Sequence, residues 1–521
     1  MPVTSTHPEY DANAPAWQRA RDILAGEDAI KAAGERYLLR LESQTDDEFK
    51  AYCNRASFFN ATGRTLDGYS GLIFRRAPFV KIPEVPSGGS PSALATALAQ
   101  FVNDCDMLGT SLTGYAKDLV TEIIGIGRAG TLVDWEGDFE NRAYISLYQT
   151  EQIINWRVER VNGRNVPTLI VLTETAPADS ASDEFANVTI PQIRVLKLVE
   201  GRDDRAASSA SRPVPSAVTS GRDDRAASSG VSKPTYAYQV EIWQQQPASK
   251  KGDQADWTLT ETRTPMRLGK PLPLIPFVFH GPRNSKPSVD KLPLSDLINV
   301  NLDHYRLDAD YKHGMHFTAM PTAWVSGFEK TSSLRIGSST AWVSETPGAT
   351  AGYLEFTGDG LQTFERALDR AEKLLAILGS RLLEAEKRVA ETAQSIQLRQ
   401  SGEDSVLANV STSLSESLTQ VLRWVYWWNS TEETPEVLTD NLVSVSLNTD
   451  FSITGMDSNE LREIVAAWQA GAISQDTMLE LFRRGEILPD GRSNEDELAL
   501  IKGRDDRAAS SSRNSQPSTL N

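Results

Sequence analysis

The sequence predicts an α+β fold, and three observations support this. Apolar residues recur every three or four positions through most of the first 124 residues, which is typical of helices packed on a core. From Thr131 to about His280 the chain consists of short segments rich in β-branched and aromatic residues, separated by turn residues. A helical pattern then returns and includes a long apolar stripe at residues 407–425. We therefore expect helices on both sides of an antiparallel β region.

Composition narrows the class of protein. The chain has 521 residues, of which 40% are hydrophobic and 24% charged, as in globular proteins. Cys53 and Cys105 are its only cysteines, too few for a zinc cluster and typical of a reducing cytosol. We expect neither a signal peptide nor a membrane span, because no apolar run is long enough. The net charge of −17 argues against a protein that grips DNA by neutralising its phosphates.

The N-terminal third is predicted to hold three helical segments. The first runs from Pro15 to about Leu41, and the second begins at Thr45 or Asp46. The third covers residues 94–124. Its expected apolar face consists of Leu108, Leu112, Tyr115, Leu119 and Ile123.

The predicted strands are TLVDW, AYISLY, IINWRVERV, PTLIVLTET, IRVLKLVE, YAYQVEIWQ, DWTLTETRT and PLPLIPFVF. The nine-residue repeat GRDDRAASS begins at Gly201, Gly221 and Gly503. Two copies fall between IRVLKLVE and YAYQVEIWQ, in a segment with almost no large apolar side chains. We interpret residues 201–234 as a lengthened hairpin loop, and the third copy as the start of a solvated tail.

The C-terminal half is again helical. One helix begins near Leu294, with Leu297, Ile298, Leu302, Tyr305 and Ala309 on one side. Residues 361–428 are predicted to be helical with a break near Ser401, and residues 456–488 to form two short helices.

A glycine-rich stretch, Gly125-Ile-Gly-Arg-Ala-Gly130, matches the G-x-G-x-x-G pattern of dinucleotide-binding loops. That chemistry needs a strand before the loop and a helix after it, so that phosphate meets a helix N-terminus. Here the predicted helix comes first and the strand follows. The glycines therefore favour a helix stop and a tight turn, and we expect no nucleotide or other cofactor.

Three further groups of residues have a functional and a structural interpretation. Residues 302–316 concentrate three histidines with three aspartates, but His304 and His313 fall on opposite sides of a helix, which disfavours a metal site. The Arg-Asp-Asp-Arg core of the repeat neutralises itself and favours a solvated spacer over a metal or phosphate site. The third group has two interpretations, a phosphate-binding patch or interface and ion-pair arginines, and the second is favoured. Its members are Arg64, Arg75, Arg76 and Arg128.

Four stretches of the chain resemble, in the same order, blocks of tailed-bacteriophage portal proteins. They are KAYCNRASFFNATGRTLDGYSGLIFRRAP, DLVTEIIGIGRAGTLVDW, EAEKRVAETAQSIQLRQSGEDSVLANVSTSLSESLTQVLRWVYWW and DSNELREIVAAWQAGAISQDTMLELFRRGEILPD. The lengthened loop and the tail, which carry the repeat, depart from the family.

The resemblance implies a portal-like subunit with a helical stem, a β-rich clip, a wing with a long helix and a small helical crown. It implies the following division: residues 1–93, N-terminal helical wing region; 94–130, first stem helix; 131–290, β-rich clip with a flexible insert at 201–234; 291–317, second stem helix; 318–455, wing with long helices at 361–428; 456–502, helical crown; 503–521, disordered tail.

The resemblance also implies a function and partners. Portal subunits form a ring, commonly of twelve copies, at one capsid vertex of the virion, assembled in the bacterial host cytoplasm. Double-stranded DNA passes through the ring during packaging and ejection. The implied protein partners are the terminase large subunit, head–tail adaptor or tail proteins, and the major capsid and scaffold proteins, with no membrane.

An acidic wall that repels DNA would let it slide through such a ring. The residues that we expect to face the channel are Arg306, Lys312, Gln400, Glu403 and Asp404. The alternatives are a nucleotide-dependent enzyme that uses the GIGRAG loop, or another structural or scaffold-associated protein of the phage head.

Overall fold

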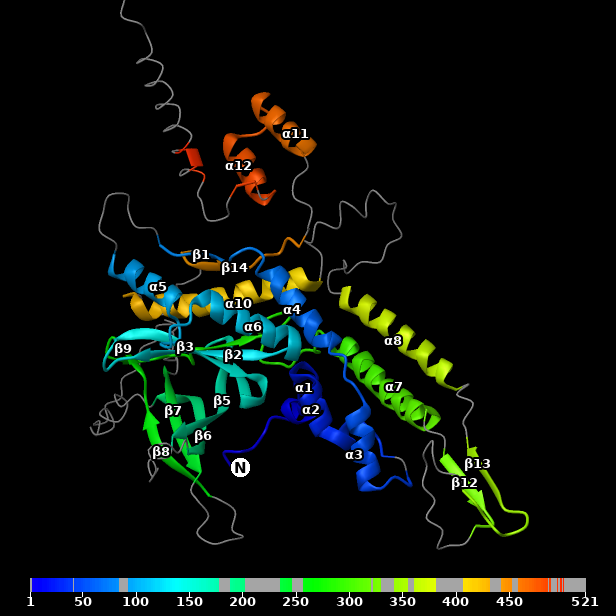
Figure 1. Cartoon of the computed structure of the whole chain (residues 1–521). Helices are drawn as coiled ribbons and strands as arrows, with labels where there is room; N and C mark the ends of the chain where they lie inside the picture. Colours follow the sequence, from blue (N-terminus) through cyan, green and yellow to red (C-terminus); the bar gives the residue numbers. More distant parts are fainter. Residues whose placement is uncertain are drawn as a thin grey trace, which may run out of the picture.

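A computed structural model of the chain describes residues 2–485, except 41, 84–91, 178–187, 202–234, 246–255, 320–321, 329–341, 355–359, 381–405, 432–441 and 452–457. Beyond residue 485 it describes 487, 488, 494, 497, 498 and 500. Within these residues the fold is α+β, as predicted. Figure 1 shows a central body of helices and sheets, from which a helix pair and a small helical unit project. Of the helices in the described ranges, none has the length and apolarity to cross a membrane.

The first N-terminal helix begins earlier than predicted, and the second begins where predicted. Helix α1 (Pro8–Ala25) starts before Pro15, because the His7 side chain accepts the N–H of Glu9 and Pro8 fits the first turn. A capping box of Thr45 and Glu48 begins α3, which confirms the predicted start of the second segment. The elements of this region are α1, α2 (Glu27–Ala33), the 3-10 helix η1 (Gly34–Arg36), α3 (Asp46–Arg55) and α4 (Ala61–Ile73).

The single helix predicted over residues 94–124 is wrong. It is two helices, α5 (Ala93–Asn103) and α6 (Leu112–Ile126), because Ser111 caps the start of α6 and accepts the N–H of Gly114. Leu108, predicted to lie on the apolar face, is 87% exposed in the loop between them. The other four residues of that predicted face are buried: Leu112, Tyr115, Leu119 and Ile123.

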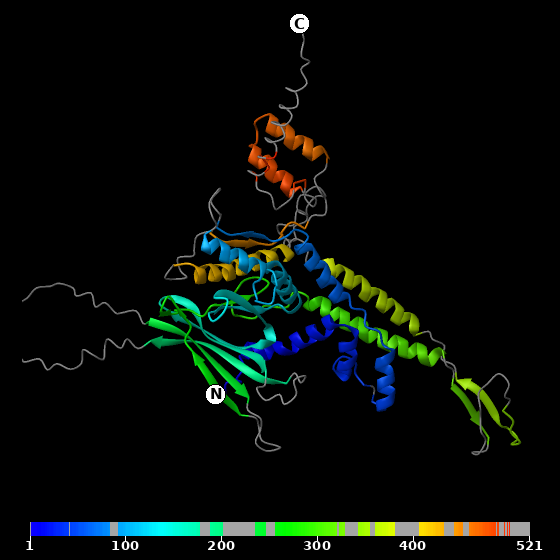
Figure 2. The same ribbon diagram turned by 60° about the vertical axis from the view of Figure 1, so that its left-hand side comes forward.

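The predicted β region is confirmed as two antiparallel sheets. The first has the strand order β11-β2-β3 and the second is a meander of β4 to β8, seen obliquely in Figure 2. Strands β6 and β7 pair up to Gly201 and Thr235, which confirms the predicted hairpin. The residues between them, and all three repeats except Gly201, lie outside the described residues. The strands are β2 (Ala129–Glu136), β3 (Arg142–Gln149), β4 (Ile153–Val161), β5 (Arg164–Pro177), β6 (Thr189–Gly201), β7 (Thr235–Gln245), β8 (Trp257–Arg263) and β11 (Phe277–His280), with the 3-10 helix η2 (Thr150–Gln152) before β4.

Helix α10 (Val406–Asn429) is the centre of the core. Its predicted apolar stripe, from Leu407 to Val425, is at most 2% exposed. The helix lies between the β2–β3–β11 sheet and the strand pair formed by β1 (Phe79–Lys81) and β14 (Ser444–Ser446), as Figure 1 shows. The predicted break near Ser401 lies outside the described residues.

A helix pair extends from this body and carries a small hairpin at its far end (Figures 1 and 2). Helices α7 (Ser295–Ala319) and α8 (Leu361–Ser380) are joined through the hairpin of β12 (Thr322–Ser326) and β13 (Thr350–Leu354). Two contacts show that the helices are antiparallel. Tyr311 donates to Glu365 at 2.8 Å, and His304, which is earlier in α7, lies 3.7 Å from Glu372, which is later in α8. We call α7, α8 and the β12–β13 hairpin the arm.

Two small units complete the described chain. A short antiparallel pair joins β9 (Met266–Arg267) to β10 (Lys270–Pro271). Helices α11 (Ser458–Gln469) and α12 (Gln475–Arg484) confirm the two short helices predicted near the C-terminus. Ser474 caps α12 by accepting the N–H of Thr477.

Candidate interaction surface

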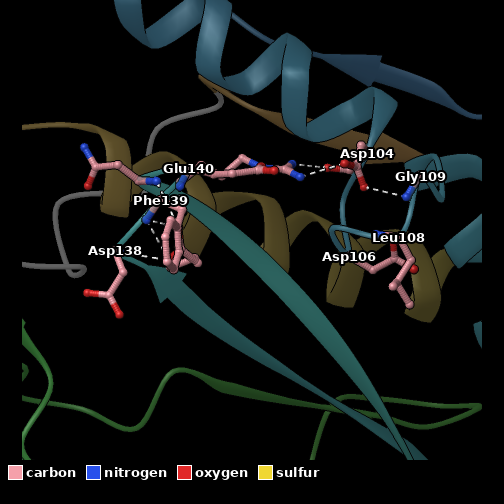
Figure 3. A network of polar contacts seen from close by, with 10 residues as sticks. Asp104, Asp106, Leu108, Gly109, Asp138, Phe139 and Glu140 are labelled. Atoms are coloured by element: carbon pink, nitrogen blue, oxygen red, sulfur yellow. Dashed lines mark hydrogen bonds and ion pairs between the residues drawn. The ribbon is translucent and has the colours of Figure 1, made fainter. Parts of the chain in front are cut away.

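Two loops at one end of the β2–β3 sheet are fastened together by Arg142. Its Nη2 donates to the Asp104 carboxylate and its Nη1 to the Asp104 carbonyl, both at 2.6 Å. Its Nε donates to Glu140 in the β2–β3 turn. The Arg142 side chain is 9% exposed, whereas the Asp104 and Glu140 side chains are 31% and 52% exposed. The guanidinium is therefore desolvated and held in a fork geometry, while its acidic partners keep contact with water. Figure 3 shows Asp104 and Gly109 on one side of this network and Asp138, Phe139 and Glu140 on the other.

The β2–β3 turn is ordered by the Glu136 carboxylate. It accepts the backbone N–H groups of four consecutive residues, 138 to 141, at distances from 2.6 to 3.2 Å. Desolvation raises the pKa of this carboxyl, but the backbone donors outweigh it and hold the pKa below its ordinary value. Asn141 takes a left-handed conformation (φ +52°) and accepts from the Trp135 indole. The turn is therefore a fixed structure that presents Phe139, whose side chain is 94% exposed.

The neighbouring loop, residues 104–110, is built in the same way. The Asp106 carboxylate accepts the N–H groups of Leu108 and Thr110, and Asp104 accepts that of Gly109. These bonds replace the helical bonds that the sequence pattern predicted here. Leu108 and Phe139 thus stand exposed on two ordered loops, which marks this end of the sheet as a candidate contact surface.

A pocket of about 640 Å³ lies elsewhere on the body, between the β4–β5 hairpin, β11 and α10. Its walls are mainly apolar and include Trp156, Phe277, Phe279 and Trp424. Val158, 42% exposed, and the exposed Lys286 also line the pocket. The volume is within the range of pockets that hold a small ligand or an aromatic side chain of another protein.

The wall of this pocket contains the guanidinium of Arg128. Its carbon lies 3.9 Å from the Trp156 ring centre and 5.1 Å from that of Phe279, and Nη2 donates to the Pro287 carbonyl at 2.8 Å. Burial lowers the pKa of Arg128 to about 9, so it stays charged at neutral pH. Its Nε and Nη1 have no hydrogen-bond partner among the described residues. Glu9 also lines the pocket, and its negative charge acts to raise the pKa of Arg128, so this side of the pocket carries both an acid and the charged guanidinium.

The GIGRAG loop has the structural role predicted for it. Gly127 ends α6 in the left-handed conformation (φ +91°), with its N–H bonded to the carbonyls of Glu122 and Ile123. Gly130 lies in β2, where a Cβ atom would come within 2.2 Å of the Phe277 ring. The loop follows a helix C-terminus, which has the wrong dipole sign for phosphate. This geometry gives no support to a dinucleotide site.

A buried chain of hydrogen bonds joins α6 and β2 to β11 and α10, two of the elements that line the pocket. Tyr115 in α6 bonds Thr131 in β2, and Thr131 bonds His280 in β11, each at 2.6 Å. The other ring nitrogen of His280 bonds Ser417 in α10 at 2.8 Å. Burial lowers the pKa of His280 to about 3, so the ring is neutral and links one donor and one acceptor.

The histidines of α7 lie apart, as predicted. His304 packs beside Phe59 and faces Glu372 of α8, whereas His313 packs on Tyr52 and lies 3.4 Å from Arg55. In the part of the chain that the structure describes, no group of three or more His, Cys, Asp or Glu residues could hold a metal ion.

The arginines considered for a phosphate-binding patch, which the sequence disfavoured, lie apart in the structure. Arg64 stacks on Phe59, Arg76 forms a 3.6 Å ion pair with Asp450, and Arg128 is buried at the pocket. These contacts agree with the ion-pair and packing interpretation, and the burial of Arg128 removes it from a surface phosphate site.

Of the five residues predicted to face the channel, the structure describes two, Arg306 and Lys312. Arg306 donates to the Tyr37 carbonyl and pairs with Asp303, and Lys312 pairs with Asp308 at 3.0 Å. Both side chains are thus engaged by hydrogen bonds or ion pairs within their own subunit. The remaining candidates, Gln400, Glu403 and Asp404, lie outside the described residues.

Sequence reasoning missed Phe139, Arg142 and the pocket, and it wrongly placed Leu108 on the apolar face of a helix. One signal was present for Phe139: an aromatic residue within the turn sequence EGDFEN, where polar residues are expected. The pocket has no local signal, because its walls come from segments more than 250 residues apart.

Comparisons with known proteins give one family match. Residues 293–429, which span the arm and α10, match the model of a domain of unknown function, DUF4055. No curated protein matches the chain.

Similar solved structures come from gene transfer agent (GTA) particles. The neck of an empty particle, computed with C6 symmetry, has 10% identity and a TM-score of 0.33, covering 88% of this chain and 98% of that one. The virion of a native particle has 10% identity and a TM-score of 0.34, covering 89% and 99%. The neck of a native particle, computed with C12 symmetry, has 9% identity and a TM-score of 0.34, covering 88% and 99%. TM-scores below 0.5 do not establish a common fold, and these similarities carry no argument about this chain.

Proposed function

We propose that the chain is the portal subunit of a tailed bacteriophage. About twelve copies would form a ring at one capsid vertex of the virion. The terminase large subunit would drive DNA through the ring, and a head–tail adaptor or tail would attach to it. Major capsid and scaffold proteins would surround the ring during assembly in the host cytoplasm. The proposal rests on the four sequence blocks, and the arm is the structural observation that carries it.

The arm has the form that a channel wall requires. Only Ala371 and Leu375 of α8 are buried, and Ile377 is 58% exposed. A helix pair with one side free can pack beside its copies around an axis, where such exposed apolar residues would become covered. The hairpin at its far end would then project from the ring, in the position of a clip.

This arrangement revises the division expected from the sequence. Helix α6 does not suit the stem. A helix that lines a channel needs one solvent-exposed face, whereas ten of the fifteen residues of α6 are buried. The two β-sheets pack on α10 within the body. We therefore place the stem in α7 and α8, and the clip in β12–β13. The wing is the body of N-terminal helices, sheets and α10, and the crown is α11 and α12.

The charge of the subunit suits a channel through which DNA slides. A ring of subunits at −17 each repels DNA on average, and a repulsive wall lowers friction. Arg306 and Lys312 are neutralised within their own subunit, which would limit their grip on phosphate. Gln400, Glu403 and Asp404, in the segment between α8 and α10, remain proposed channel residues.

The test is to image the purified full-length chain by electron microscopy and to measure its mass in solution. We expect closed rings with a central channel and no ATP hydrolysis, since DNA movement is the work of the terminase. Another head structural or scaffold-associated protein would give no closed channel. A chain that stays monomeric at high concentration and moderate salt would contradict the proposal.

A further inference from the structure

We propose that Phe139 of one subunit inserts into the Trp156 pocket of the next subunit. The Trp156 pocket is the 640 Å³ hollow between the β4–β5 hairpin, β11 and α10. The inference rests on the proposed ring and names a contact that would hold it together. The occupant is thus a second copy of this chain.

The β2–β3 turn has the properties of an inserting element. Phe139 is 94% exposed, yet its backbone is fixed by Glu136, and the turn is tied to the neighbouring loop through Arg142. A side chain on a preordered turn loses little conformational entropy on binding. An exposed aromatic ring held in this way is typical of an interface anchor.

The Trp156 pocket has the properties of a receiving site. Trp156, Phe277, Phe279 and Trp424 supply aromatic walls, and the volume admits a phenyl ring with the flanking backbone. The aromatic side chains of the walls are largely buried, and the space between them is already open in the single subunit. Val158, which also lines the pocket, is 42% exposed to solvent. The pocket is therefore preformed and reachable.

The charges of the two elements are complementary. Phe139 is flanked by Asp138 and Glu140, both exposed, so the turn brings negative charge with the ring. The pocket lining carries the exposed Lys286 and one acid, Glu9, whose carboxylate already accepts the N–H of Val289. The charged Arg128 lies buried behind Trp156 and Phe279, so positive side chains outnumber the single acid. Opposite charges around an apolar anchor favour one orientation of docking.

A second copy is the occupant that fits these observations. The chain cannot fill its own pocket with its own turn, because Phe139 is almost fully exposed within one subunit. A protruding element and a receiving pocket at different places on one chain make a head-to-tail contact, which closes into a ring or grows as a filament. Ring closure is what the proposed function requires.

Cysteine cross-linking of the assembled full-length chain tests the contact. We would prepare Gly137→Cys, which keeps the Phe139 anchor and has room for a side chain, together with Val158→Cys and the double variant. Assembled protein would then be treated with a short thiol-reactive cross-linker. The natural Cys53 and Cys105 are buried and should give no background. The double variant should give a ladder of products up to the full ring, whereas a mixture of the two single variants should give only dimers. Leu39→Cys with Val158→Cys is a matched control, because Leu39 is 83% exposed in an unrelated loop.

Charge reversal tests the orientation without a cross-linker. Asp138→Lys and Lys286→Glu should each raise the protein concentration needed for ring assembly by about tenfold, and the double variant should recover to within about threefold of the wild type. Asp256→Lys, at an exposed acid away from the turn, should change nothing. Far-UV circular dichroism should confirm that each variant folds.

The outcomes separate the two proposals. Rings that form without a 137–158 cross-link, or that assemble unchanged with Asp138→Lys, overturn this inference and leave the portal function standing. A wild-type chain that remains monomeric overturns both. A cross-linked ladder together with recovery in the charge-reversed pair supports the head-to-tail contact.

Discussion

Arg142 holds Asp104 through two hydrogen bonds of 2.6 Å, one to its carboxylate and one to its carbonyl. This pairing fixes the loop between α5 and α6 to the start of β3. It explains why a segment with helical periodicity is interrupted there. It also makes Arg142 a sensitive point for the surface that presents Leu108 and Phe139.

Replacing Arg142 with Lys should destabilise the protein by about 1–3 kcal/mol, because Lys keeps the charge but cannot donate to Asp104 and Glu140 in a fork. Urea unfolding would measure the change. Hydrogen exchange should show faster exchange at Leu108 and Gly109. Arg157→Lys, at a side chain that is 60% exposed, should change stability by less than about 0.5 kcal/mol. Equal effects of the two substitutions would contradict this role for Arg142.

The buried His280 should make the protein less stable as the pH falls. In the unfolded chain the imidazole binds a proton near its ordinary pKa, whereas the folded state resists protonation until about pH 3. The contribution of His280 to the free energy of unfolding is therefore complete above pH 6.5 and is lost progressively as the pH falls from 6.5 to 3. Compared with His280→Asn, the wild type should lose up to about 1.4 kcal/mol per pH unit below 6.5.

Denaturant unfolding of both proteins at several pH values would measure this difference in slope. His316, which is half-buried, offers a control. His316→Asn keeps His280, so its free energy of unfolding should fall with pH as steeply as that of the wild type. Parallel pH profiles of the wild type and His280→Asn would show that His280 does not carry the effect.

Gly130→Ala should cost about 1–3 kcal/mol, because the new Cβ would lie 2.2 Å from the Phe277 ring, too close to fit. Gly68→Ala, in α4 with no atom within 4 Å, should instead raise stability by about 0.5–1 kcal/mol. Thermal unfolding would compare them. A neutral Gly130→Ala would show that the β2–β11 contact is looser than the structure indicates.

Replacing residues 202–234 with the dipeptide Asn-Gly should preserve the β6–β7 hairpin, because Gly201 and Thr235 already face each other in register. We expect unchanged ring assembly and a stability equal to that of the wild type or up to about 2 kcal/mol higher, since loop closure becomes easier. Electron microscopy and urea unfolding would measure both. Loss of rings would mean that a repeat-bearing residue makes an assembly contact.

The sequence predicted the elements well where one pattern dominated. The eight strand segments, the apolar stripe of α10 and the buried side of α7 were readable, because burial on one face imposes a period of two or 3.6 residues. The helix-stop role of Gly127 could also be predicted, because the patterns on either side of it show that a helix comes first and a strand follows.

Residues 94–124 show where local pattern fails. The spacing of Leu108 from Leu112 fits a helix, but Asp104 and Asp106 capture backbone N–H groups, and Arg142, 38 residues from Asp104, stabilises the loop. The cost of the lost helical bonds is offset by a partner that no local window contains. The apolar spacing therefore favoured a helix that local bonds to Asp104, Asp106 and Ser111 interrupt, with Arg142 as a distant partner.

By itself, the sequence determined the α+β class, the order of the elements and the acidic balance, because these depend on residue types and their spacing. The tertiary structure alone decided that α7 pairs with α8 and that α6 is buried. It also decided that Trp156, Phe279 and Trp424 enclose a pocket with Arg128 in its wall. Such features join segments that lie far apart in the sequence, from 54 residues for Tyr311 and Glu365 to more than 250 for Trp156 and Trp424. Side-chain packing between such segments produces no periodic pattern in the sequence from which it could be predicted.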